Sequence, residues 1–164
     1  MTARTLAASA HRRGIQLGTG LPVLDAQADF QRARRAQIAA RAVQWLPSRR
    51  VRRSHPRALK GVHTLAWGPS RLRVIALDAI VGTVEATTDF DVAFRPATNR
   101  ISTRWLRVAL AQRRAQPLPP IAAIEAPDGY YVIDGRHRVS VARALAQTDI
   151  EAWVSPMTTT TSST

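Results

Sequence analysis

Five consecutive residues in the last quarter of the chain combine side chains and a backbone type that together could bind phosphate. They are Asp134, Gly135, Arg136, His137 and Arg138. An apolar run typical of a strand precedes them at 130–133, and Val139, Ala142 and Leu145 follow at helical spacing. The glycine permits an abrupt turn between strand and helix, and two arginines and a histidine then fall in the first helical turn. Cations there oppose the helix dipole, and a bound phosphate would explain them, since backbone N–H groups and guanidinium groups would converge on it.

A second interpretation of the same five residues stays open. In it Arg136 points into solvent, Arg138 pairs with Asp134 or another carboxylate, and His137 packs against its neighbours.

The elements that must position this turn follow from periodicity and turn signals. We expect a helix over 26–46, short strands over 62–67 and 72–77, a turn or short helix at 78–80, an ordered loop over 83–98, a helix over 99–115, a hairpin of 121–125 with 130–133, a last helix and a strand over 150–154. This order predicts an α+β fold with a small mixed sheet and packed helices, preceded by a basic helical arm. We assign 1–60 to the arm with its one helix, 61–156 to the packed domain and 157–164 to a disordered tail.

The net charge is +13, which indicates a partner that carries phosphate. Residues 1–73 hold fifteen Arg and Lys against two Asp, whereas 74–164 hold nine against nine, so the excess lies entirely in the first part. The densest run supplies the candidate DNA-binding residues Arg49, Arg50, Arg52, Arg53 and Arg57. A solvated linker explains this run as well as a nucleic-acid arm does.

A second row of arginines occurs in the predicted helix over 99–115. Arg100, Arg104, Arg107 and Arg114 recur at a spacing of three to four residues along one side, opposite apolar residues. The row is either an exposed helix face or a ligand surface.

Three segments, IALDAIVGT, LPPI and YYVIDGRHRVSVARAL, resemble the ParB/sulfiredoxin superfamily over about residues 72–154. The resemblance implies a small α+β domain whose Gly-x-His-Arg turn at a helix start holds the phosphates of CTP or ATP, with or without Mg²⁺. Position 136 is Arg where sulfiredoxins have the reactive cysteine, so sulfinic acid repair is not available. Partition-type ParB proteins have Gly-Glu-Arg-Arg there, of which Gly135 and Arg138 are kept. We therefore expect a nucleotide-responsive DNA-binding protein of the kind used in plasmid or chromosome partition.

Two other functions remain open from the sequence, and whether the protein is an enzyme is undecided. A small ATP- or CTP-using enzyme of the kinase or nuclease type would grip phosphates at the same turn, with Asp78, Glu85 or Asp91 as base or metal ligand. The acidic group Asp78, Glu85, Asp89 and Asp91 could hold Mg²⁺ or simply pair with arginines. The second open function is that of an interaction module that keeps the fold alone and whose basic arm binds RNA or an acidic partner.

Several classes of protein are excluded or disfavoured. The absence of cysteine excludes disulfides and thiol chemistry, and the four histidines lack the spacing of a zinc site, so we assign no metal ligands. Neither a signal peptide nor a membrane-spanning run is visible. We expect a cytoplasmic protein without a membrane partner. The protein could form a homodimer.

Overall fold

The structure, a computed structural model, describes residues 18–44, 55–59 and 66–158. These residues form an α+β fold, as the sequence predicts. The elements in chain order are α1 (Pro22–Gln44), β1 (Arg57–Ala58), β2 (Ala66–Trp67), β3 (Arg71–Ala76), the 3₁₀ helix η3 (Leu77–Ala79), β4 (Ile80–Thr83), α2 (Ser102–Arg113), β5 (Ile121–Ala126), β6 (Gly129–Asp134), α3 (Arg136–Ala144) and β7 (Asp149–Thr158). None of the helices in these ranges is long and apolar enough to cross a membrane.

The strands form one mixed sheet. β5 and β6 make the predicted antiparallel hairpin, whose turn ends at Gly129 with a φ of 132°. β4 pairs in parallel with β6 and β1 in parallel with β4, while β7 pairs in parallel with β5 on the other side. The free edge of β7 takes both β3 and β2 in antiparallel register. The two short strands on either side of Gly68 therefore lie along one edge of β7.

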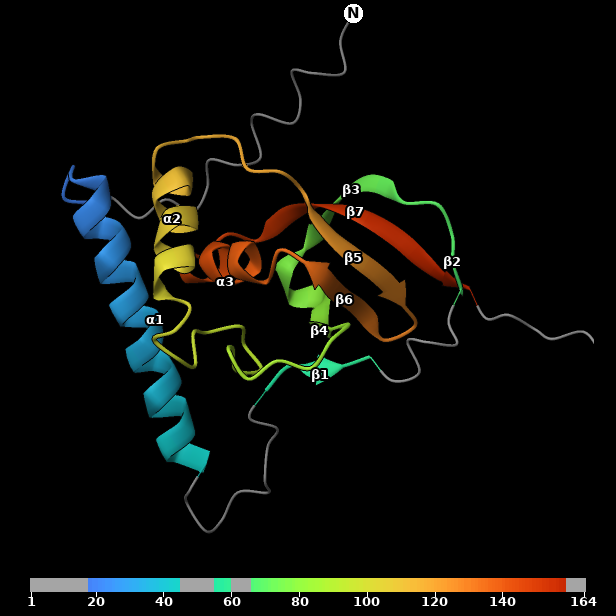
Figure 1. The fold of residues 1–164 in the computed structure, drawn as a ribbon, viewed down its shortest axis with the longest axis horizontal. Helices are drawn as coiled ribbons and strands as arrows, with labels where there is room; N and C mark the ends of the chain where they lie inside the picture. The colour runs from blue at the N-terminus through green and yellow to red at the C-terminus, as the bar shows by residue number, and fades with distance from the viewer. Residues whose placement is uncertain (1–17, 45–54, 60–65, 159–164) are drawn as a thin grey trace, which may run out of the picture.

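The three helices cover one face of this sheet in two layers (Figure 1). α3 packs on the strands, and its Val139 and Ala142 join a core with Ile121, Val132 and Val154. α1 and α2 then pack on the outer side of α3. Trp105 of α2 is fully buried there, stands edge-on to Phe30 of α1 at 5.3 Å between centroids, and donates its indole N–H to Ser140 Oγ of α3 at 2.8 Å.

α1 is held to α2 by charge as well as by apolar packing. Arg113 of α2 lies within 2.7 Å of Asp29 and 3.6 Å of Asp25, all three side chains being at least nine-tenths buried. Asp29 also accepts from Arg32 at 3.0 Å, and Asp25 accepts from the backbone N–H of Thr19 at 2.9 Å. The hydrogen bond from Thr19 is the main reason that the pKa of Asp25 is lowered.

The division of the chain into arm, domain and tail can be compared with these contacts. α1 and β1, which we assigned to the arm, pack on or pair with elements of the domain, whereas the expected boundary after residue 60 lies outside the described residues. β7 continues through Thr158, two residues into the predicted tail, because β2 pairs with Met157 and Thr158. Residues 159–164 also lie outside the described part.

Candidate phosphate-binding site

The predicted turn is formed by the end of β6 and the start of α3. Gly135 adopts a φ of 102°, in the left-handed region, and directly precedes the first residue of α3. A Cβ at this position would lie 2.5 Å from Ile121 Cγ2, so both the backbone conformation and the lack of space require glycine. As at every helix start, the first N–H groups of α3 have no partner within the helix and can donate hydrogen bonds to an anion.

Arg138 is bound by its own chain on all sides. Its Nη1 donates to the carbonyl oxygens of Pro119 and Pro120, at 2.7 Å for Pro120, and its Nη2 lies 2.7 Å from Asp134 Oδ2. Only 14% of the side chain is exposed. The pairing with Asp134 is the arrangement foreseen in the second interpretation of the turn. Arg138 ties the segment before β5 to the start of α3, and we describe it as a positioning residue.

Arg136 is held less tightly than Arg138. Its Nη2 is 3.8 Å from Glu85 Oε2, which is beyond hydrogen-bonding distance, and 82% of the Glu85 side chain is exposed. Solvent screens such a pair strongly. Arg136 is therefore the guanidinium of the predicted five residues that could turn to an incoming phosphate at small cost.

His137 is half-buried and stays uncharged at neutral pH. Its ring stands edge-on to Phe90 at 5.3 Å between centroids, and its Nε2 is buried without a hydrogen-bond partner among the described residues. Burial first, and then the positive charges of Arg104 and Arg136, lower its pKa from 6.5 to about 4. The histidine can offer a phosphate one neutral N–H at most, so the positive charge at the turn comes from arginine.

Arg104 of α2 is the residue that the sequence analysis did not connect with the turn. It acts electrostatically on His137, although the two residues belong to different helices. Its side chain is exposed, with no ion pair among the described residues. The arginine spacing in 99–115 marked it as a surface residue, but no local pattern could show that this surface adjoins α3.

Arg104 belongs to a row of exposed arginines along α2, which we call the α2 stripe. Its members are Arg100, Arg104, Arg107 and Arg114. Only Arg100 is paired with a carboxylate among the described residues, at 2.5 Å from Asp89. From first to last position the stripe extends about 21 Å at the helical rise. The structure thus places Arg104 and Arg107 on the exposed side of α2, with Arg100 just before this helix and Arg114 directly after it.

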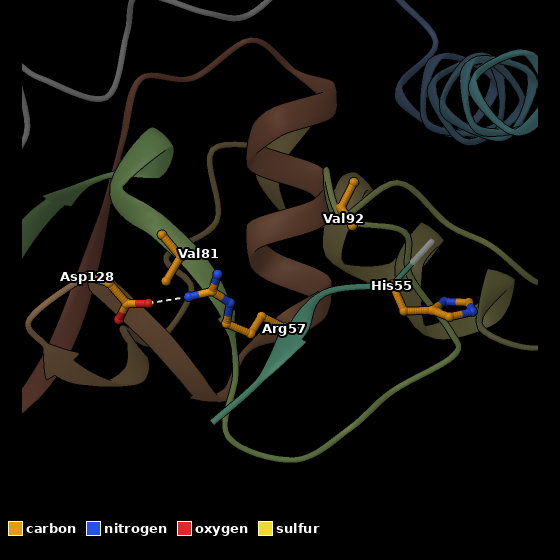
Figure 2. Close-up of a pocket in the computed structure, with 5 residues that line it drawn as sticks. All are labelled: His55, Arg57, Val81, Val92 and Asp128. Carbon is orange, nitrogen blue, oxygen red and sulfur yellow. Dashed lines mark hydrogen bonds and ion pairs between the residues drawn. The ribbon is translucent and has the colours of Figure 1, made fainter. Parts of the chain in front are cut away.

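Of the five candidate DNA-binding arginines, only Arg57 lies in the part of the chain that the structure describes. Arg49, Arg50, Arg52 and Arg53 lie outside the described residues. Arg57 of β1 and Asp128 of the β5–β6 turn point toward one another at 2.5 Å, at a cavity of about 380 Å³ that His55, Val81 and Val92 also line (Figure 2). The positive charge of Arg57 is thus already compensated by the carboxylate of Asp128, although about half of the Arg57 side chain is exposed.

The acidic residues considered for metal binding do not converge. Asp91 pairs with Arg95 at 2.7 Å and accepts the backbone N–H groups of Ala93 and Arg95, Asp89 pairs with Arg100, and Glu85 lies near Arg136. Within the described part of the chain no group of three or more Asp, Glu or His side chains could hold a metal ion. For Asp89 and Asp91 the interpretation as partners of arginine is confirmed.

Comparison with protein-family models, with curated proteins and with solved structures finds no match to this chain.

Proposed function

We propose that the protein binds DNA through the phosphate backbone, using the α2 stripe together with the basic residues of the first third of the chain, and that a nucleotide held at the start of α3 regulates this binding. The observation that carries the proposal is the α2 stripe, a row of exposed arginines of which only one has a carboxylate partner among the described residues.

The distribution of ion pairs supports this proposal. All eleven Asp and Glu residues of the chain lie in the described ranges, and eight of them already pair with arginines of the fold. The protein therefore has few carboxylates left to neutralise Arg104, Arg107 and Arg114. Phosphates of a nucleic acid would supply the missing negative charge and release counterions on binding.

Contacts of this kind position a duplex without reading its sequence. Arginine can also read base edges, but it does so from an element that enters a groove. The arginines of the stripe are instead exposed at the surface of α2, a helix that packs against α1 and α3. We therefore expect affinity with weak sequence preference.

The nucleotide would be held by the first N–H groups of α3, by Arg136 and by Arg104, while Arg138 keeps the turn in place. ATP and CTP both present the triphosphate that these groups could bind, with or without Mg²⁺. Because Arg104 belongs to the α2 stripe and also acts on the turn, nucleotide phosphates and DNA phosphates would compete for it. A bound nucleotide is therefore expected to weaken DNA binding.

The test of DNA binding is an anisotropy titration of a labelled duplex of random sequence across a salt series. Affinity should fall by orders of magnitude between about 50 mM and 200 mM salt if several phosphates are contacted. Replacing Arg104, Arg107 or Arg114 by alanine should each weaken binding and lower the log–log salt slope by about one.

Arg71→Ala is the matched control, because Arg71 is an exposed arginine on β3 without a carboxylate partner among the described residues and lies away from α2. It should leave the slope unchanged. An affinity independent of salt, or an equal loss in the control and the stripe variants, would overturn the proposal.

A further inference from the structure

A second cavity lies at the other end of α3 from the turn. Its volume is about 410 Å³, it is open to solvent, and it is lined by α1, by η3, by the loop after β4 and by the last turns of α3. The side chains that line it and matter here are Arg143 and Ala144 of α3, Asp78 of η3, Ala33 and Ala36 of α1, and Ala93 of the loop. None of the residues 134–138 lines it.

Arg143 is a fixed cation in the wall of this cavity. Its Nη2 donates to the carbonyl oxygens of Leu77 at 2.7 Å and Ile80 at 3.1 Å, and its guanidinium lies 5.1 Å from the centre of the Phe94 ring. Within the described residues no carboxylate lies within ion-pair distance of it, and its Nε is buried without a hydrogen-bond partner. Burial lowers its pKa, but an arginine keeps its charge at neutral pH. Arg143 therefore carries a partly buried positive charge that no carboxylate of the described residues neutralises by direct contact.

Asp78 provides a negative charge in the same cavity. Its side chain is exposed and makes no ion pair or hydrogen bond with any described residue. Asp78 and Arg143 line the same cavity without an ion pair between them, and Asp78, followed by Asp91, partly offsets the lowering of the pKa of Arg143 by burial.

The other charged residues around the cavity are already engaged. Asp29 is held by Arg113 and Arg32, and Arg95 is held by Asp91 and by the carbonyl oxygen of Ala36. One cation and one anion, Arg143 and Asp78, therefore remain for a ligand.

The remaining wall is small and apolar. Besides Ser140, it consists of Ala33, Ala36, Ala93 and Ala144, so the space between the two charges can accept a hydrocarbon group. A mostly apolar cavity of a few hundred Å³ with a few convergent polar groups is the usual form of a small-molecule site.

We propose that this cavity binds a small zwitterion with an apolar body, the chemical class to which free apolar amino acids belong. The carboxylate of the ligand pairs with Arg143, its ammonium group pairs with Asp78, and its apolar part lies against the four alanines. A plain anion would meet the repulsion of Asp78, and a plain cation that of Arg143. A nucleotide brings several negative charges and is a poor match for a wall in which Arg143 and Asp78 are the charged residues without an ion pair among the described residues.

The test is an NMR titration of the full chain, labelled with ¹⁵N, with three probes of nearly the same size. L-Phenylalanine carries both charges, 3-phenylpropionate only the carboxylate and phenethylamine only the ammonium. We expect shifts around α3 and η3 with phenylalanine, and affinities lower by about tenfold or more for the two analogues, since each lacks a charge-assisted hydrogen bond. Equal affinity for phenylalanine and either analogue, or no binding of phenylalanine in the millimolar range, would overturn the proposal.

Two charge variants extend the test. Asp78→Asn should remove the preference for phenylalanine over 3-phenylpropionate, and Arg143→Gln should remove the preference over phenethylamine. A preference that survives both substitutions would contradict the assignment of the two charges.

A pair of volume variants keeps the proposal testable if Arg143→Gln does not fold. Ala36→Leu places a larger side chain in the cavity wall, whereas Ala39→Leu makes the same change at an exposed position of α1 that does not line the cavity. Phenylalanine binding should be lost in the first variant and kept in the second. Unchanged binding in Ala36→Leu would show that the ligand lies elsewhere.

Discussion

Arg136 and Arg138 are separated by two positions in one helical turn, yet the structure gives them different surroundings. Arg138 satisfies two backbone carbonyls and a carboxylate and is mostly covered, whereas Arg136 is 3.8 Å from a single, largely exposed glutamate. A residue that is fully engaged by the fold contributes to stability, and one that is weakly engaged can contribute to binding. The two substitutions should therefore separate these effects.

Arg138→Ala should lower the free energy of unfolding by about 2 kcal/mol, because it leaves two carbonyl oxygens and Asp134 without their donor. Arg136→Ala should change it by less than about 0.5 kcal/mol but should weaken ATP and CTP binding, because it removes the adjustable guanidinium. Urea denaturation and calorimetric titration of the two variants measure the two quantities. An Arg136→Ala variant with wild-type nucleotide affinity would contradict the proposed site.

His137 makes stability depend on pH. Its pKa is about 4 in the folded protein and near 6.5 in the unfolded chain, so the unfolded chain binds the proton first as the pH falls. The contribution of neutral His137 to the free energy of unfolding should be fully present above pH 6.5 and should be lost as the pH falls toward 4. The decrease attributable to His137 should be about 1–2 kcal/mol, allowing for its partial exposure.

The measurement is the urea midpoint as a function of pH, with His137→Gln as the control. The variant should lose the part of the pH dependence that lies in this window. An identical profile in both proteins would show that other groups cause the dependence.

At the scale of elements, the position of α1 depends on the buried cluster of Arg113, Asp29 and Asp25. The hydrogen bonds run from Arg113 of α2 to Asp29 of α1, residues 84 positions apart. The pKa of Arg113 is raised, first by its hydrogen bond to Asp29, which means that the folded protein favours the charged guanidinium. Because α1 also contributes Phe30 to the packing around Trp105, loosening this cluster should disturb the contact between α1 and α2 as a whole.

Asp29→Ala should lower the free energy of unfolding by about 3–5 kcal/mol, because it leaves Arg113 buried without its main partner. Asp149→Ala, at an exposed position that makes no ion pair among the described residues, should cost less than about 0.5 kcal/mol. Denaturation curves of both variants, together with hydrogen exchange in α1, measure the effect. Equal costs in the two variants would show that the charged cluster does not hold the helix.

At the scale of the whole molecule, the proposed nucleotide and DNA surfaces meet at Arg104. Two ligands that use one residue must affect one another by the same factor in both directions. ATP or CTP should therefore weaken the binding of duplex DNA by the factor by which the duplex weakens nucleotide binding. Calorimetric titration of each ligand with and without the other measures both factors.

Arg104→Ala should abolish this coupling in addition to weakening DNA binding. Arg114→Ala is the control, because Arg114 belongs to the stripe but lies ten positions, about three helical turns, from Arg104. This variant should weaken DNA binding and keep the coupling. Coupling that persists in Arg104→Ala would place the communication elsewhere in the molecule.

The local features of this protein follow from its amino-acid sequence. The hairpin of β5 and β6, the glycine turn, α3 and α2 with its row of arginines were all predictable, because each follows from residues a few positions apart: a two-residue turn, a left-handed glycine, or apolar residues at helical spacing. The net charge was equally visible in the sequence.

Which charged side chains are available to a ligand depends on how the elements pack together. Arg138 is occupied by carbonyl groups of Pro119 and Pro120, Arg57 by Asp128, 71 positions away, and Arg143 shares a cavity with Asp78. No local pattern contains these partners, because an ion pair or a hydrogen bond depends on distance in space and on exclusion of water, and both arise only when helices and strands far apart in the chain pack together.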